Sequence, residues 1–596
     1  MGKKIIKFMD TSFRDGFQSV FGGRVATKDF IEPLKAAVKS GIRHFEAGGG
    51  ARFQSLFFYC NESAFDMMDT FRKTVGPEVD LQTLARGINV VALSQQPRDM
   101  IDLHAKMFKK HGITTIRNFD ALNDLQNLKF SGECITNHGL HHQIVIALMD
   151  LPPGCEGAHD KEYYLNTLKN ILDSDVPFNS ICFKDASGTA NPRKIYETIK
   201  GARKLVPKNT ILHLHTHDTA GSSINQYMGA IEAGIDKIDL AMSPVSGGTG
   251  QPDILTMWHA LKGTNYTLDI DPEEIIKVEE VFEESFRDYF FPPESRMVSP
   301  LIPFSPMPGG ALTANTMMMR DNGTLHLFPK VIKEMSEVVR LGGFGASVTP
   351  VSQFYFQQAY LNVTLGKWEK INPSYGEMIL GYFGKTPVEP DPKIVKLASE
   401  QLEKPIFNGD PLDLLNPGIP IAEKILKKND LPINDENLFI VSSCETKGVE
   451  FLLGNGKNSI RKKTAQEDSN STETIKSNLQ SESRDYSITV NGNTFDVRVT
   501  SGKSSSSQSV SSNETNSKSR TSSNKATQIY APNPGNILNL NVVLGENVLE
   551  KQTLLVLEAM KMESEVKSPH SGIVKNIHVN SGDNVKSGDL LITIEK

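Results

Sequence analysis

Short runs of β-forming residues alternate with helical patterns over the first 260 residues. Eight such runs occur, at residues 5–11, 44–48, 81–86, 115–119, 143–149, 180–184, 211–216 and 238–242. This alternation predicts parallel strands joined by helices, in an α/β fold that is either a closed (β/α)8 barrel or a doubly wound open sheet. Because eight runs occur and no G-x-G-x-x-G turn follows the first, we favour the (β/α)8 TIM barrel and assign residues 1–290 to it.

The rest of the chain divides into three regions by composition. Residues 291–453 have mainly helical patterns broken by Pro-rich segments, and they predict a helical extension packed on the barrel. Residues 454–528 are dominated by Ser, Asn, Thr and Lys, which cannot bury enough apolar surface to offset chain entropy, so we expect a flexible linker. Within it, residues 486–499 alternate apolar and polar positions around Asn491-Gly492, which predicts a β-hairpin.

The last region, residues 529–596, contains one pattern twice with an offset of 37 positions. The shared positions are Gly535, Gly545, Asn547, Val548, Leu554 and Leu557, which recur as Gly572, Gly582, Asn584, Val585, Leu591 and Ile594. A small, strand-rich unit that is duplicated in this way predicts a flattened β-barrel with pseudo-twofold symmetry.

The composition indicates a soluble multidomain protein of the cytoplasm. Hydrophobic residues make up 38% of the chain and the formal net charge is -6, which argues against binding to nucleic acid or to an anionic membrane surface. No run of about 18 uncharged apolar residues is present, so no membrane-spanning helix is expected. The five cysteines are widely spaced without a C-x-x-C pair, and we interpret them as reduced thiols.

Lys561 lies in the sequence Glu558-Ala559-Met560-Lys561-Met562-Glu563, at the junction of the two copies. A lysine there is expected at a hairpin tip, where it is exposed and accessible to a modifying ligase. Residues 529–596 with this hexapeptide resemble a biotin carboxyl carrier domain. The resemblance implies that biotin protein ligase attaches biotin covalently to Lys561. A lipoyl domain has the same fold but usually lacks the two flanking methionines.

Polar residues gather at the carboxyl ends of the predicted strands, where (β/α)8 barrels place their active sites. His215 and His217 point the same way from one strand, and Asp15 adds a carboxylate from another strand end, which suits a divalent metal such as Zn²⁺, Mn²⁺ or Co²⁺. Lys184 ends a neighbouring strand, and because an ammonium cannot be a ligand, it joins such a site only if CO₂ carbamylates it. We interpret His213, on the same face, as a core or supporting residue.

Seven segments extend the resemblance over nearly the whole chain. They are residues 10–19, 86–89, 118–124, 183–188, 215–221, 308–310 and 348–350. Together they resemble the carboxyltransferase subunit, designated B, of pyruvate carboxylase, a pattern shared with the oxaloacetate decarboxylase alpha subunit and the pyruvate-handling subunit of transcarboxylase. The resemblance implies that the metal is bound by Asp15, carbamylated Lys184, His215 and His217.

The resemblance also implies a substrate site. Arg14, Gln18 and Arg86 would hold the 2-oxo acid, and Thr349 would shuttle a proton between substrate and biotin. The favoured function is therefore the carboxyltransferase and carrier subunit of a two-subunit pyruvate carboxylase, which transfers CO₂ from carboxybiotin to pyruvate and gives oxaloacetate. The chain has no ATP-binding glycine-rich loop, so a separate ATP-dependent biotin carboxylase subunit is the expected partner, and we expect a homo-oligomer.

Four positions depart from the family pattern. Phe17 stands where the family usually has His, and Gly48 where it has Trp. Gln54 replaces an Asp and Leu93 a Tyr, both of which help to hold the biotin ring. Three alternatives therefore stay open: an oxaloacetate decarboxylase alpha subunit that feeds a sodium pump, a carboxylase of another 2-oxo acid, and a non-catalytic carrier scaffold.

Overall fold

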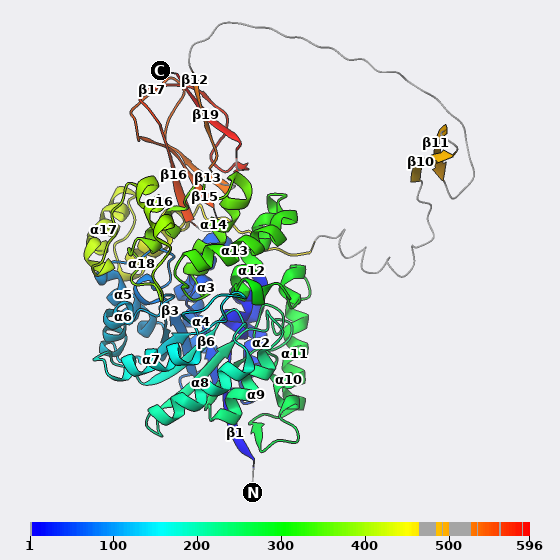
Figure 1. The fold of residues 1–596 in the computed structure, drawn as a ribbon. Helices are drawn as coiled ribbons and strands as arrows, with labels where there is room; N and C mark the ends of the chain where they lie inside the picture. Colours follow the sequence, from blue (N-terminus) through cyan, green and yellow to red (C-terminus); the bar gives the residue numbers. More distant parts are fainter. Residues whose placement is uncertain are drawn as a thin grey trace.

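The computed structural model describes residues 3–463, 484–490, 493–499, 526–532, 535–559, 562–586 and 588–595 (Figure 1). Eight parallel strands form its barrel: β1 (Lys4–Asp10), β2 (His44–Glu46), β3 (Asp80–Ala85), β4 (Thr115–Asn118), β5 (His141–Ala147), β6 (Ser180–Asp185), β7 (Ile211–Thr216) and β8 (Lys237–Leu240). β1 pairs with both β2 and β8, which closes the barrel, and β9 (Tyr266–Leu268) adds to β1 outside it. The predicted TIM barrel is confirmed.

Helices surround the barrel and connect its strands. They include α2 (Thr27–Lys39), α4 (Ala64–Val75), α5 (Arg98–Lys110), α6 (Gln126–Asn137), α7 (Lys161–Leu172), α8 (Pro192–Leu205), α9 (Ser223–Ala233), α10 (Ile254–Ala260) and α11 (Pro272–Phe286). In α8, the Asn191 side chain caps the first turn and Pro192 occupies the first helical position. Ile195, Ile199 and Ala202 then recur at helical spacing and are buried, which fixes the face that packs on the sheet.

Two of the four family departures lie in the apolar core between the barrel and its surrounding helices. After β1 the chain forms a π-helical turn, η1 (Ser12–Gly16), and the short helix α1 (Phe17–Phe21). The Phe17 ring is fully buried, 5.9 Å from the ring of Phe13 and 5.3 Å from that of Phe286. Gly48 has φ +75°, and a Cβ there would lie 2.7 Å from the Met68 sulfur. Both positions are therefore set by packing in this chain.

Seven α-helices follow the barrel in the described residues, at or beside the carboxyl ends of its strands. They are α12 (Gly309–Asp321), α13 (Phe328–Leu341), α14 (Val351–Leu365), α15 (Pro373–Ile379), α16 (Pro392–Leu402), α17 (Gly418–Lys428) and α18 (Asp435–Leu452). One apolar core joins strand-end residues such as Leu84 and Ala147 to α13 and α14 through Val338 and Phe354. None of the helices in the described residues combines the length and the apolar character needed to cross a bilayer.

The segment after α18 stays against the barrel. The backbone N–H of Ser459 donates to Tyr59 O at 2.7 Å, and that of Lys463 donates to Asp288 O at 2.8 Å. The polar composition predicts a linker from residue 454, whereas the structure holds residues 454–463 in place by backbone hydrogen bonds. Residues 464–483 and 500–525 of the predicted linker lie outside the described residues.

The predicted hairpin region contains two paired strands. β10 (Arg484–Val490) runs antiparallel to β11 (Asn493–Val499), and Val490 faces Asn493 in the register. The expected turn residues, Asn491 and Gly492, lie between these strands and outside the described residues.

The C-terminal domain consists of two four-stranded antiparallel sheets. One contains β12 (Ala526–Tyr530), β19 (Leu590–Glu595), β17 (Gly572–Ile577) and β14 (Asn547–Val548), in that order; the other contains β16 (Met562–Lys567), β15 (Thr553–Ala559), β13 (Gly535–Leu540) and β18 (Asn584–Val585). The 37-residue offset maps β13, β14 and β15 onto β17, β18 and β19. Leu554 and Leu557 are fully buried with their counterparts Leu591 and Ile594. This arrangement confirms the predicted duplicated, flattened β-barrel.

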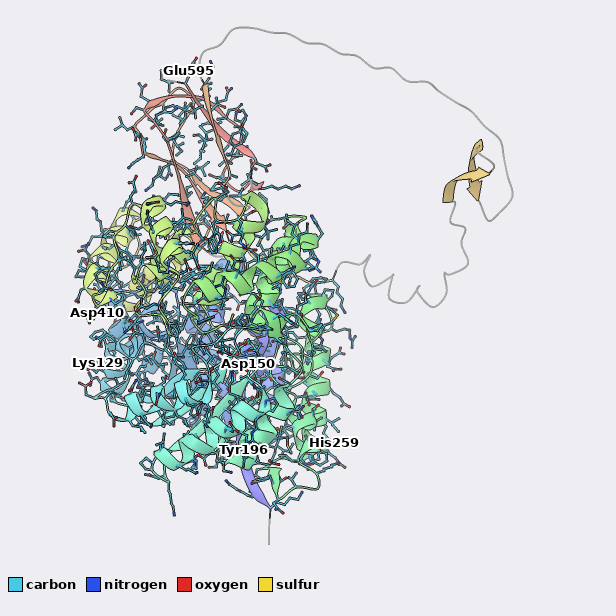
Figure 2. The ribbon with its side chains drawn as sticks, viewed as in Figure 1. Lys129, Asp150, Tyr196, His259, Asp410 and Glu595 are labelled. Atoms are coloured by element: carbon cyan, nitrogen blue, oxygen red, sulfur yellow. The ribbon has the colours of Figure 1, made fainter. Side chains whose placement is uncertain are left out.

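The C-terminal domain sits over the helices at the carboxyl end of the barrel (Figure 1). Its β15–β16 hairpin points toward these helices. Glu595 of β19 lies at the opposite end, away from the barrel (Figure 2).

Candidate active site

The predicted metal ligands come from separate segments that meet at the carboxyl end of the barrel. Asp15 lies in the π-helical turn after β1, and Lys184 is the penultimate residue of β6. His215 is in register with Lys184 on the neighbouring β7, and His217 follows that strand directly. All four side chains are buried. They occupy the end at which barrels of this type carry their active sites.

Asp15, His215 and His217 form a cluster with metal-ligand geometry. Asp15 Oδ2 lies 3.5 Å from His215 Nε2 and 3.3 Å from His217 Nε2. One ligand atom from each of the three residues lies within 4.8 Å of the others. His217 Nδ1 lies 2.7 Å from the carbonyl of Thr249, to which it donates, so its Nε2 carries the lone pair. These side chains therefore fit a divalent cation.

His215 gives the clearest test of whether a cation fits this cluster. Its Nδ1 lies 2.6 Å from Asp239 Oδ2, and its buried Nε2 has no hydrogen-bond partner within the described residues. A buried polar atom without a partner is costly unless something binds it. A cation held by Nε2 together with Asp15 and His217 would satisfy it.

Lys184 is buried beside this cluster and lines the same small cavity as Asp15 and His217. Burial lowers its pKa to about 8, with a further lowering by the charges of Arg117 and Arg14. A lower pKa increases the fraction of neutral amine near neutral pH. Since the neutral amine is the form that reacts with CO₂, this environment suits the carbamylation that the sequence predicts.

Cationic and amide groups lie next to the cluster. Arg14 pairs with Glu46 and lies 3.2 Å from Asp15 Oδ2, while its Nη1 donates to Gln18 Oε1 at 3.2 Å. Arg86 donates to two backbone carbonyls, and no carboxylate of the described residues pairs with it. Burial and the charge of Arg14 lower the pKa of Arg86 to about 9. A buried guanidinium without an acidic partner suits an anionic ligand.

Two cavities meet at this site. The inner one, of about 40 Å³, is lined by the predicted ligands Asp15, Lys184 and His217. The outer one, of about 500 Å³, shares four wall residues with it: Gln18, Arg86, Gly310 and Thr349. Thr349 is half-buried and therefore stands where a group from the outer cavity would meet a substrate in the inner one.

The C-terminal domain forms one wall of the outer cavity. Asn536, Glu558, Ser581 and Asn584 line it together with residues of the barrel and α12. Lys561 itself lies outside the described residues, but Ala559 pairs with Met562 across the β15–β16 hairpin. The described residues on either side of it belong to β15 and β16, and Glu558 of β15 lines the outer cavity.

Gln54 and Leu93, the other two of the four departures, line the outer cavity. Gln54 Nε2 donates to the carbonyl of Ser443 in α18 at 2.8 Å. This carbonyl is exposed by a break in the helix, since Glu445 has φ 48° and ψ −134°. A carboxylate could not make the bond because it has no donor. The substitution at residue 54 thus matches the broken helix that packs on it.

Three functional candidates escaped prediction: Arg117, Asp239 and Gln251. Gln251 Nε2 lies 3.1 Å from both Asp15 Oδ2 and His217 Nε2. Asp239 was detectable as a carboxylate inside a predicted strand, whereas nothing in the sequence distinguishes Gln251 from other loop amides. His213 lies 2.6 Å from Asp239 and has the supporting place expected of it.

Comparisons with known proteins agree with this architecture. Three family models match: an HMGL-like domain at residues 141–282, a conserved carboxylase domain at residues 302–505 and a domain of biotin-requiring enzymes at residues 527–594. The chain is 31% identical over 404 residues to the methylmalonyl-CoA carboxyltransferase 5S subunit of Propionibacterium freudenreichii, covering 68% of this chain and 78% of that protein.

Two longer matches cover almost the whole chain. The pyruvate carboxylase subunit designated B in Methanocaldococcus jannaschii is 28% identical over 561 residues, which are 94% of each chain. The 2-oxoglutarate carboxylase large subunit of Hydrogenobacter thermophilus is 26% identical over 603 residues, 95% of this chain and 91% of that one. The carboxyl transferase domain of Rhizobium etli pyruvate carboxylase shares the fold, with a TM-score of 0.68 at 23% identity over 76% of this chain and 77% of that one.

Proposed function

This chain belongs to the family of biotin-dependent carboxyltransferases that includes pyruvate carboxylase subunits, and we propose that it transfers a carboxyl group from biotin on Lys561 to pyruvate, which gives oxaloacetate. One observation carries the proposal. The inner cavity, with its ligand cluster and Arg86, which pairs with no carboxylate of the described residues, opens into the outer cavity, which Glu558 of the β15–β16 hairpin helps to line. An acceptor site and a carboxyl carrier thus share one cavity.

The side chains divide into binding and proton-transfer roles. Asp15, carbamylated Lys184, His215 and His217 would hold a divalent metal, which supplies Lewis-acid polarisation of the 2-oxo group. Arg86 binds the substrate carboxylate through its planar guanidinium.

Three neighbouring residues complete the substrate site. Gln18 and Arg14, joined by a hydrogen bond of 3.2 Å, orient the 2-oxo acid from the side of Asp15. The Thr349 hydroxyl, at the boundary of the two cavities, relays the methyl proton of the acceptor toward biotin.

The function requires partners outside this chain. Biotin protein ligase would modify Lys561, and a separate ATP-dependent biotin carboxylase subunit would load the biotin with its carboxyl group. Two relatives are each named as a single subunit of pyruvate carboxylase, which supports this division of labour. We further propose that the protein works in the cytoplasm as a homo-oligomer, in the domain arrangement 1–290, 291–453, 454–528 and 529–596.

The identity of the acceptor is tested with a panel of 2-oxo acids. Purified biotinylated chain, biotin carboxylase subunit, ATP and bicarbonate are incubated with pyruvate, 2-oxoglutarate and longer acids, and the carboxylated products are measured. We expect pyruvate to be the best acceptor. Preference for 2-oxoglutarate, the acid in the name of one relative, would reassign the acceptor, and recovery with membrane subunits would indicate an oxaloacetate decarboxylase.

The barrel site is tested by Lys184→Ala. We expect transfer to fall by at least about 100-fold because the metal loses a ligand, while a streptavidin blot shows unchanged biotin. Lys208→Ala, an exposed lysine before the amino end of β7, is the matched control and should transfer normally. Full activity in Lys184→Ala would show that transfer does not depend on Lys184, whereas absence of transfer in wild type would favour a scaffold for the carrier.

A further inference from the structure

A layer of charged and polar side chains crosses the barrel below the ligand cluster. It contains Arg117 from β4, Gln143 from β5, His213 from β7 and Asp239 from β8. Arg117, His213 and Asp239 are fully buried. The interior of such a barrel is normally filled by branched apolar residues, and a buried ion pair rarely adds stability over a hydrophobic core. The layer therefore calls for a functional explanation.

Asp239 is the centre of this layer. Its Oδ2 lies 2.6 Å from His215 Nδ1, and its Oδ1 lies 2.6 Å from His213 Nε2. The Arg117 guanidinium reaches Asp239 from the other side of the barrel and pairs with the same carboxylate. Arg117 is held in turn by Gln143, whose Oε1 accepts from Nε at 2.6 Å. The carboxylate thus has a fixed position and no freedom to rotate.

The pairing with Arg117 determines the tautomer of His215. A carboxylate paired with a guanidinium can only accept hydrogen bonds, so His215 Nδ1 must donate to it. The Nε2 lone pair then points at Asp15, 3.5 Å away, and is available to a cation. The Thr249 carbonyl has the same effect on His217, from a loop instead of a strand.

Gln251 completes the arrangement on the side of Asp15. Its Oε1 accepts from the Thr11 hydroxyl at 2.8 Å, which fixes the orientation of the amide. The NH₂ group is thereby directed at Asp15 Oδ2, 3.1 Å away. Asp15, His215 and His217 therefore each have a buried polar partner: Gln251, Asp239 and the Thr249 carbonyl.

We propose that Asp239, held by Arg117, is a positioning residue that orients His215 for the divalent cation and sets the affinity of the cluster for it. The inference rests on the metal site of the proposed function. Loss of a buried carboxylate behind a ligating histidine typically weakens metal binding by about 10- to 100-fold. If Asp239 has this role, its substitution should lower the affinity for the cation much more than it lowers the stability of the fold.

The test is a titration of chelator-treated, full-length protein with Co²⁺, whose visible absorption reports the ligands. Asp239→Asn keeps the shape of the side chain but removes its charge. We expect this variant to bind Co²⁺ about 10- to 100-fold more weakly than wild type, with a changed spectrum at saturation. His142→Gln is the matched control: it removes a buried histidine of the barrel whose hydrogen bonds go to Pro177 and Asn118 and not to Asp239, and it should keep near wild-type affinity.

Folding is followed separately by the thermal midpoint in the presence of chelator. A merely structural role would lower that midpoint and leave the saturated Co²⁺ spectrum unchanged, and this result would overturn the inference. If Asp239→Asn does not fold, Arg117→Lys takes its place, since lysine keeps the charge but cannot bridge both carboxylate oxygens. Wild-type Co²⁺ affinity in the folded variant would also overturn the inference, whereas absence of Co²⁺ binding by wild type would overturn the metal site itself.

Discussion

His104 on α5 is a histidine that burial keeps neutral. Its ring lies 4.2 Å from the Phe108 ring, and its Nε2 has no hydrogen-bond partner in the described part of the chain. Burial lowers the pKa of His104 from 6.5 to about 3. The unfolded chain therefore binds a proton in this pH range that the folded chain excludes, and stability falls as the pH falls below about 6.5.

This dependence of stability on pH gives a prediction for His104→Leu. Wild type should lose up to about 3 kcal/mol more stability than the variant between about pH 6.5 and pH 4, since each pKa unit is about 1.4 kcal/mol. The measurement is the thermal midpoint of both proteins across this range. Asp10 and Asp120, whose pKa values burial raises to about 7, titrate equally in both proteins and cancel. Parallel curves would show that His104 does not titrate as its burial implies.

The sequence reveals the candidate metal ligands better than it reveals the residues that orient them. Asp15, His215 and His217 are recognisable because their positions at strand ends predict that they lie close together. The structure places their side chains in one cluster. Asp239 is 24 positions from His215, and only the closed barrel shows that the two side chains touch. The same holds for Gln54, whose partner Ser443 is 389 positions away.

At the scale of elements, the break in α18 stores backbone strain. Glu445 has φ 48° and ψ −134°, a conformation that costs an ordinary residue about 1–3 kcal/mol. Glycine adopts such angles freely. The break is kept in this chain, where it lines a cavity of about 140 Å³ beside Leu93 and Glu558.

Glu445→Gly should therefore stabilise the protein. We expect a gain of about 1 kcal/mol after the entropy cost of glycine is subtracted, measured as the free energy of unfolding in denaturant. Glu450→Gly is the control, since the same substitution at a regular position of α18 should destabilise by about 1 kcal/mol. A loss of stability in both variants would indicate that Glu445 makes contacts worth more than the strain.

Hydrophobic periodicity predicts the elements that have buried apolar faces. It fails for segments that are held in place mainly by backbone hydrogen bonds. All eight barrel strands overlap the runs predicted from the sequence, because parallel strands of a barrel appear as short apolar runs between helical patterns. Residues 454–463 are too polar to predict as fixed structure, yet the backbone bonds to Tyr59 and Asp288 hold them in place. The π-helical turn that carries Asp15 is likewise invisible in the pattern.

For the whole molecule, the linker composition predicts an intramolecular carrier. Tethering typically gives the second partner a roughly millimolar effective concentration. A protease site is inserted within residues 500–525. Before cleavage, carboxyl transfer should be fast and its rate should not depend on the protein concentration. After cleavage, transfer should slow and become proportional to the carrier concentration.

The measurement is single-turnover transfer to pyruvate at several dilutions, with protease-treated wild type as the control. If the cleaved protein kept its rate on dilution, the carrier would be held by its docking contacts and not by the linker.

The duplicated C-terminal domain has a practical consequence. The offset of 37 that relates β13–β15 to β17–β19 also relates β16 to β12. The β15–β16 hairpin therefore has as its counterpart the pair β19 and β12, in which Glu595 faces Ala526. The β15–β16 hairpin and the β19–β12 pair therefore lie at opposite ends of the C-terminal domain. A fluorophore attached after β19 would lie at the end that faces away from the barrel (Figure 2). Its signal would report when the C-terminal domain docks on the barrel, and the dye would not obstruct the outer cavity.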